Sequence, residues 1–404
     1  MLRIAATLCC FLSYLAVAQG AVTFTGNVSP DDPKSWTSDE GAFVGFEFPG
    51  AVTVDGGDVL HASDLFISRG TRETGSVGRV SVDGAASAIA VDGYIRLATF
   101  GDATLSVTNG GYVSGRTLDI CAGPWSAGKV TVDGEGSSVE INNGLRSGEV
   151  YVGRGGNGIL SITGGATVTS YNTLIGYGHG SNGAVTVSGP GSTWINSGPL
   201  SVGDGHKTSP TPNGVGMLTI SDGGTVRSFN GIIGFSRECI GTATIDGVGS
   251  TWTTEGVIDV GVFGNGRLAI TGGAAVDCYL GRVGTYSPGG SGEAVVDGPG
   301  SIWTCRNGLS IGTGDPRDTG VVTISNGGTV KLFSTQGDGD PFYLSTTSPG
   351  VLHMSSGGML ALEGEADDSL EQFLELVDGT DDIRYYDRAS GTWDHLGGAT
   401  YGND

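Results

Sequence analysis

A short alternation of apolar and polar residues recurs along most of the chain. Each copy begins with an apolar residue, continues with a residue that is usually Thr or Ser, and ends with a second apolar residue, as in Val130, Thr131 and Val132. A glycine follows closely. Alternation with a period of two places the apolar pair on one face, which is typical of a half-buried β-strand. Glycine suits the turn that follows, because it adopts positive φ at little cost. The copies lie at 52–54, 80–82, 105–107, 130–132, 160–162, 185–187, 218–220, 243–245, 268–270, 294–296, 322–324 and 352–354.

The spacing of these copies predicts a stacked fold. The second apolar residue recurs every 25 to 33 positions, and each repeat offers two further short strands, such as 193–195 and 174–176. One such repeat cannot bury its own apolar face, so neighbouring repeats must stack. We therefore predict an all-β, right-handed parallel β-helix (β-solenoid) of about twelve coils. A propeller is the alternative, since its blades take ~40–50 residues and two coils together are of comparable length.

Two kinds of coil alternate, so the true repeat is a double coil. One kind reads GAVTVSGPGSTW from Gly183, and the other reads ILSITGGATV from Ile159. The residue after the first strand is mostly aspartate in one kind and threonine or serine in the other. This alternation separates many carboxylates by about 10 Å, near the Debye length, which softens their repulsion. Weak calcium binding along this acidic ridge is the functional alternative. The aspartates are Asp55, Asp83, Asp133, Asp246 and Asp297.

The alternating coils carry a family resemblance. They are similar to the repeat family associated with type V autotransporters and PEP-CTERM exosortase-sorted proteins, over nearly the whole mature chain. The resemblance implies a β-helical, passenger-like protein of the cell surface and says little about activity. The chain departs from the family by lacking a C-terminal translocator barrel and a Pro-Glu-Pro sorting tail. Asp404 is therefore either the natural end or the end of a truncated sequence.

The two ends of the chain differ from the repeats. Residues 1–18 form a short apolar segment after Arg3 and are expected to be a signal peptide, which predicts Sec export to the outer cell surface or the medium. Residues 19–50 are expected to cap the first coil, 51–362 to form the repeats and 363–404 to cap the last. Ser369 and Gln372 form a capping box for a short helix at 369–377. The mature chain contains no apolar run long enough to span a membrane.

Composition narrows the range of partners. The chain has 76 glycines in 404 residues and a formal net charge of −22. Such an acidic surface disfavours nucleic acids and anionic membranes, which require clustered Lys and Arg. The partners expected instead are extracellular polysaccharides or other surface proteins.

Cysteine and tryptophan residues supply two candidate features. Aligned coils place Cys278 beside Cys305, which predicts either a disulfide between adjacent coils or two stacked thiols. Trp194, Trp252 and Trp303 occupy one position of the repeat, where other coils have valine or isoleucine. That equivalence indicates core residues, whereas an outward strip that stacks on sugar rings is the alternative.

Catalytic patterns are weak in this sequence. Gly178, His179 and Gly180 resemble the histidine motif of polygalacturonases, but sister coils have unrelated residues there, which favours a turn histidine. The aspartate pairs at 367–368 and 381–382 lie outside the repeats, and no catalytic, cofactor-binding or metal-binding residues are predicted. We therefore expect a non-catalytic structural or adhesive protein. The alternative is a polysaccharide lyase, a polysaccharide hydrolase or a glycan-binding module.

Overall fold

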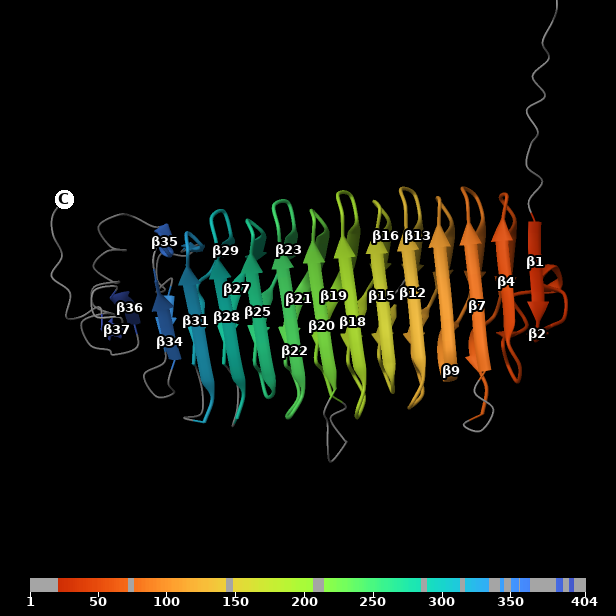
Figure 1. Cartoon of the computed structure of the whole chain (residues 1–404), viewed down its shortest axis with the longest axis horizontal. Helices are drawn as coiled ribbons and strands as arrows, with labels where there is room; N and C mark the ends of the chain where they lie inside the picture. The colour runs from red at the N-terminus through yellow and green to blue at the C-terminus, as the bar shows by residue number, and fades with distance from the viewer. Residues whose placement is uncertain are drawn as a thin grey trace, which may run out of the picture.

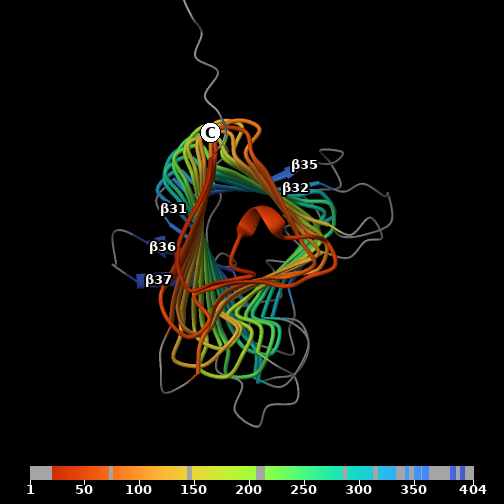
Figure 2. The ribbon, with the colours of Figure 1, turned by 90° about the vertical axis from the view of Figure 1, so that its right-hand side faces the viewer.

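The chain folds into a long rod of stacked coils (Figure 1). The computed structural model describes residues 21–71, 76–142, 148–205, 214–284, 289–312, 317–333, 342–344, 350–355, 357–363, 383–387 and 392–395. It is an all-β parallel solenoid of about eleven turns, which confirms the predicted architecture and excludes the propeller. Viewed end-on, the coils enclose a three-sided core (Figure 2).

Three columns of parallel strands form the sides of the rod, and each strand pairs with its counterpart in the next coil. The first column contains β4 (Gly50–Asp55), β7 (Ser76–Asp83), β9 (Tyr94–Thr108), β12 (Ala127–Asp133), β15 (Asn157–Thr163), β18 (Asn182–Ser188), β20 (Val215–Ser221), β22 (Ile240–Asp246), β25 (Asn265–Thr271), β28 (Ser291–Asp297), β31 (Thr319–Ser325) and β34 (Gly350–Met354). These strands point upward on the near side of Figure 1 while the chain advances from right to left, so the winding is right-handed.

The second and third columns complete each coil. The second contains β5 (Val59–Ala62), β8 (Ala88–Val91), β10 (Tyr112–Gly115), β13 (Ser138–Ile141), β16 (Thr167–Ser170), β19 (Thr193–Val202), β21 (Thr225–Ile233), β23 (Thr251–Thr254), β26 (Ala275–Cys278), β29 (Ile302–Cys305), β32 (Thr329–Phe333) and β35 (Met359–Glu363). The third contains β3 (Ala42–Val44), β6 (Leu65–Arg69), β11 (Thr117–Ile120), β14 (Glu149–Val152), β17 (Asn172–Ile175), β24 (Val257–Val260), β27 (Leu280–Val283), β30 (Leu309–Ile311) and β33 (Phe342–Leu344). Three long strands turn a corner: β9 joins the third column to the first, and β19 and β21 join the second to the third.

From the coil of Val168 to the coil of Trp303, the core alternates between bulky and thin layers, which gives the double coil a physical basis in that part of the rod. Coils with tryptophan in the second column have a large aliphatic residue in the third, such as Leu200 with Trp194 and Ile258 with Trp252. The intervening coils have valine in the second column and a small residue, such as Gly231, in the third. A Cβ atom on Gly231 would lie 2.5 Å from Cζ2 of Trp252. The indole therefore extends into space that the preceding coil leaves empty.

Buried serines tie the first corner of one coil to the coil before it. Ser137 Oγ accepts a hydrogen bond from the backbone N–H of Gly110 (2.9 Å), and Ser192 Oγ accepts one from Gly165 (3.1 Å). The same contact recurs in other coils of this kind, and these serines are at most 1% exposed. The turn before each serine, which begins with a glycine three residues earlier, therefore pairs backbone donors between coils, since an unpaired buried N–H is costly. The serines are Ser87, Ser137, Ser192, Ser250 and Ser301.

Antiparallel strands close the N-terminal end. β1 (Ala21–Gly26) pairs with β4, and β2 (Val28–Ser29) pairs with β3. The short helix η1 (Pro33–Ser35) lies across the open end of the core in Figure 2. Next to it, Trp36 is 5% exposed and donates through Nε1 to the carbonyl oxygen of Pro30 at 3.1 Å. These contacts cover apolar surface and strand edges that the first coil would otherwise expose.

Near the other end, β36 (Ile383–Asp387) continues the first column beside β34, and β37 (Thr392–His395) pairs antiparallel with β36. The expected signal peptide at 1–18 and the expected helix at 369–377 lie outside the described residues. In the part of the chain that is described, no helix is long and apolar enough to cross a bilayer.

Candidate functional site

The three tryptophans lie inside the rod. Trp194, Trp252 and Trp303 are each 0% exposed. The alternative in which they stack on sugar rings is therefore wrong, and the interpretation as core residues holds. The reason is the strand alternation: their position shares the inner face with Val168 and Val226 in neighbouring coils.

A buried polar ladder runs beside the tryptophans at the last inner position of the second column. Ser170 Oγ accepts a hydrogen bond from Trp194 Nε1 (3.2 Å), and Ser228 Oγ accepts one from Trp252 Nε1 (3.0 Å). In each case the serine belongs to the coil before the tryptophan. Before Trp303 this position holds Cys278, and Trp303 Nε1 has no hydrogen-bond partner among the described residues.

This difference predicts that Cys278→Ser stabilises the protein. The serine hydroxyl would supply the acceptor that the other two indoles have, and a buried hydrogen bond contributes about 1 kcal/mol. Urea denaturation in the presence of a reductant should show the midpoint shifting to higher urea. Cys278→Ala is the control, and it should not raise the midpoint because alanine offers no acceptor. A serine variant no more stable than the alanine variant would contradict the assignment.

The cysteine pair stacks as the alignment predicts but is not bonded. Cys278 and Cys305 are in register on β26 and β29, and their Sγ atoms lie 3.6 Å apart as free, buried thiols. A disulfide needs about 2.05 Å, so the structure contains the stacked thiols rather than the bridge. Burial, reinforced by Cys278, raises the pKa of the Cys305 thiol. The nucleophilic thiolate form is disfavoured there.

The acidic ridge is stabilised by hydrogen bonds as well as by separation. Thr163 Oγ1 donates to Asp133 Oδ1 in the preceding coil at 2.5 Å, and Thr271 Oγ1 donates to Asp246 Oδ1 at 2.5 Å. Ser325 Oγ donates to Asp297 Oδ1 at the same distance. The hydroxyl coil therefore solvates the carboxylate of the acidic coil. No group of three or more His, Cys, Asp or Glu side chains able to hold a metal ion occurs within the described ranges.

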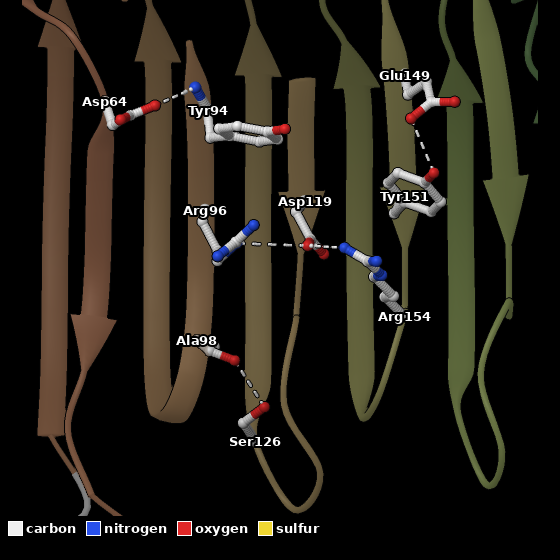
Figure 3. Close-up of polar contacts among 9 residues, drawn as sticks. All are labelled: Asp64, Tyr94, Arg96, Ala98, Asp119, Ser126, Glu149, Tyr151 and Arg154. Carbon is white, nitrogen blue, oxygen red and sulfur yellow. Dashed lines mark hydrogen bonds and ion pairs between the residues drawn. The ribbon is translucent and has the colours of Figure 1, made fainter. Parts of the chain in front are cut away.

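A buried ion-pair cluster lies on the outer face of the third column (Figure 3). Asp119, whose side chain is 0% exposed, lies between two arginines in neighbouring coils. Its Oδ2 accepts a hydrogen bond from Arg154 Nη1 at 3.0 Å and lies 3.6 Å from Arg96 Nε. Burial raises the pKa of Asp119, and the two arginines oppose that shift. Farther along the column, Arg282 donates to both carboxylate oxygens of Asp259 and forms a bidentate pair.

These ion pairs hold adjacent coils together. Each joins strands that are already hydrogen-bonded, β9 with β11 and β24 with β27, and each carboxylate is occupied by a guanidinium group. The guanidinium carbon of Arg154 also lies 4.8 Å from the centroid of the Tyr151 ring, within cation–π range. We therefore assign Asp119 and Asp259 to the structure of the wall.

The described structure has a groove at the corner between the second and third columns. It encloses about 560 Å³, within the roughly 300–1,000 Å³ typical of ligand sites. Tyr171 and Phe229 supply its aromatic surface, and Asn142, Ser197 and Glu255 are among its polar residues. These five residues occupy the same corner position in five successive coils, so the groove runs along the axis of the rod.

A glycine keeps this groove open. Gly198 donates its backbone N–H to the carbonyl oxygen of Tyr171 at 2.5 Å. A Cβ atom there would lie 2.4 Å from that oxygen and 3.4 Å from Cε1 of the tyrosine ring. Beneath the groove, Asn196 Oδ1 accepts hydrogen bonds from Ser170 Oγ (2.9 Å) and Thr173 Oγ1 (2.8 Å). The base of the groove is therefore fixed by buried hydrogen bonds.

The aromatic residues of the groove belong to a longer row. In four alternate coils the residue after the last inner position of the second column is aromatic, and we call these four residues the corner aromatic row. Phe229 is 48% exposed and Tyr279 is 42% exposed, whereas Tyr171 and Phe333 are half-buried. The intervening coils have polar residues at the same corner, including Ser197, Glu255 and Arg306. The row consists of Tyr171, Phe229, Tyr279 and Phe333.

Sequence reasoning missed the aromatic residues that the structure exposes at this corner. Aligning Val168, Val226 and Val276 would have found Tyr171, Phe229 and Tyr279 three residues later in each case. His179 lies in the exposed turn after β17, as predicted. The aspartate pairs at 367–368 and 381–382 are outside the described residues.

Comparison with known proteins identified no relative. No protein-family model, curated protein or solved structure matches the chain. The similarity to autotransporter and PEP-CTERM-associated repeats stays a prediction from the sequence.

Proposed function

We propose that this chain is a secreted or cell-surface, non-catalytic repeat protein with a structural and adhesive role in the envelope or extracellular matrix. The observation that carries the proposal is the continuous parallel register of the first column from β4 to β34. Such a stack is a stiff rod that presents equivalent outward positions at each coil, about 4.8 Å apart. Repetitive display of weak contacts suits adhesion, because linked sites reinforce one another.

The groove favours binding over turnover. Glu255 is the carboxylate among its described lining residues, whereas glycoside hydrolysis ordinarily uses two that flank the bond. The buried carboxylates of Asp119 and Asp259 are paired with arginines on another face. Secretion is supported by the apolar N-terminal segment, and a surface role by the repeat resemblance.

We expect the purified chain to release neither reducing ends nor unsaturated ends from pectin, alginate or fucoidan. A reducing-sugar assay and absorbance of the unsaturated product would both detect turnover, and a commercial lyase serves as the positive control. Fractionation of the source cells should place the chain without residues 1–18 at the surface or in the medium. Clear turnover, or retention of the whole chain in the cytosol, would overturn the proposal.

A further inference from the structure

The corner aromatic row has a spacing set by the fold. The last paired residues of the second column, such as Ser170, Asn196 and Ser228, stack in register, so the corner residues that follow them recur in alternate coils at a spacing of about 9.6 Å. The coil of Trp194 has one extra residue at this corner, between Asn196 and Pro199. Two β-linked pyranose rings in an extended polysaccharide span a similar length, and successive rings in such a chain present alternate faces. A chain lying along the axis would therefore place every second ring next to an aromatic side chain.

The chemistry of the corner also fits a sugar chain. The face of an aromatic ring carries partial negative charge and attracts the C–H groups on the flat face of a pyranose. Between the aromatics, Ser197, Glu255 and Arg306 offer hydrogen-bond donors and acceptors to hydroxyl groups. The groove from Asn142 to Glu255 adds a concave surface that crosses several coils.

Charge and pattern disfavour other occupants. A formal net charge of −22 repels acidic polysaccharides and nucleic acids over the whole surface. Protein interfaces usually have a contiguous apolar core, whereas polar residues separate the aromatics of this row. An uncharged polymer is not repelled by the negative charge, and one whose repeat matches two coils can contact aromatic residues that polar residues separate.

We propose that the corner aromatic row, with the groove at Tyr171 and Phe229, binds a neutral, extended, β-linked polysaccharide along the axis of the rod. The proposal rests on the adhesive role proposed above and names the class of ligand. Because the coil spacing repeats, contact extends to Tyr279 and Phe333, and longer chains bind more tightly than short ones.

Calorimetric titration of the purified chain with neutral β-1,4-linked hexasaccharides tests this inference, using gluco-, xylo-, manno- and N-acetylated chito-oligomers. At least one series should bind, with the hexamer tighter than the dimer. Phe229→Ala should weaken binding at least tenfold, because it removes the central exposed ring. Phe263→Ala is the matched control: Phe263 is a 37% exposed phenylalanine outside the row, and its loss should leave affinity unchanged.

The outcomes separate this inference from the broader function. If no neutral oligomer binds, or if Phe229→Ala and Tyr279→Ala both bind as the unmodified chain does, the row is not the site. That result would not contradict the proposed adhesive role, because the adhesive role does not depend on this ligand. Cleavage of a bound oligomer would instead overturn the non-catalytic function. A urea midpoint for Phe229→Ala equal to that of the unmodified chain shows that any loss of affinity is local.

Discussion

Replacing Gly234 with alanine is expected to lower the free energy of unfolding by at least about 3 kcal/mol. Gly234 has φ +73°, where a Cβ atom alone costs roughly 1–2 kcal/mol. The added Cβ would also lie 2.6 Å from the carbonyl carbon and oxygen of Asn265 in the next coil. The backbone cannot easily move away, because Gly234 donates its N–H to Val202 at 2.8 Å. Urea denaturation followed by circular dichroism measures the loss.

Gly180→Ala separates the two causes of this loss. Gly180 has a similar φ of +66°, but nothing lies within 4 Å of an added Cβ. This variant should therefore lose only about 1–2 kcal/mol, the cost of the dihedral. Equal losses in the two variants would mean that backbone conformation, and not contact between coils, explains the glycine at this corner.

The architecture could be predicted because the sequence pattern that indicates it recurs in every coil. Alternation with a period of two fixes which side chains face inward, and repeat alignment fixes which residues stack. The alternation predicts that Trp252 is buried, and the repeat alignment predicts that Cys278 lies in register with Cys305, as the structure shows. Hydroxyl and acidic coils were predicted to alternate, but the hydrogen bond from Thr163 to Asp133 depends on side-chain geometry that a sequence alignment does not contain.

The candidate site was harder to predict because it lies at a corner. Inside a strand, alternation gives the direction of each side chain, but at a bend between two strands that rule ends. Tyr171 and Phe229 follow the last inner residue of the second column, so their exposure depends on how the chain turns into the third. The groove further depends on Gly198, whose missing side chain leaves room beside the tyrosine ring. Composition and spacing do not contain that information.

Gly231→Val is expected to destabilise the protein by about 3 kcal/mol, through overpacking of the core. The added Cβ would lie 2.5 Å from Cζ2 and 2.9 Å from Cη2 of Trp252, a fully buried ring. The indole cannot move away from the added side chain without disturbing the hydrogen bond from Trp252 Nε1 to Ser228 Oγ. The φ of Gly231 is not in the left-handed region, so valine meets no backbone strain there. The loss in urea denaturation would report packing alone.

Trp252→Val in the same chain should restore much of that stability. Alone, it should cost on the order of 3 kcal/mol, because it leaves a cavity where the indole lay. Together, the two valines reproduce a combination that other coils already use, since Val113 and Val139 stack in two adjacent coils whose third column has Leu118 and Val150. The double variant should therefore lose less than the sum of the single losses, with a coupling of about 2 kcal/mol. Additive losses would mean that bulky and thin layers are independent, and that the double coil has no packing basis.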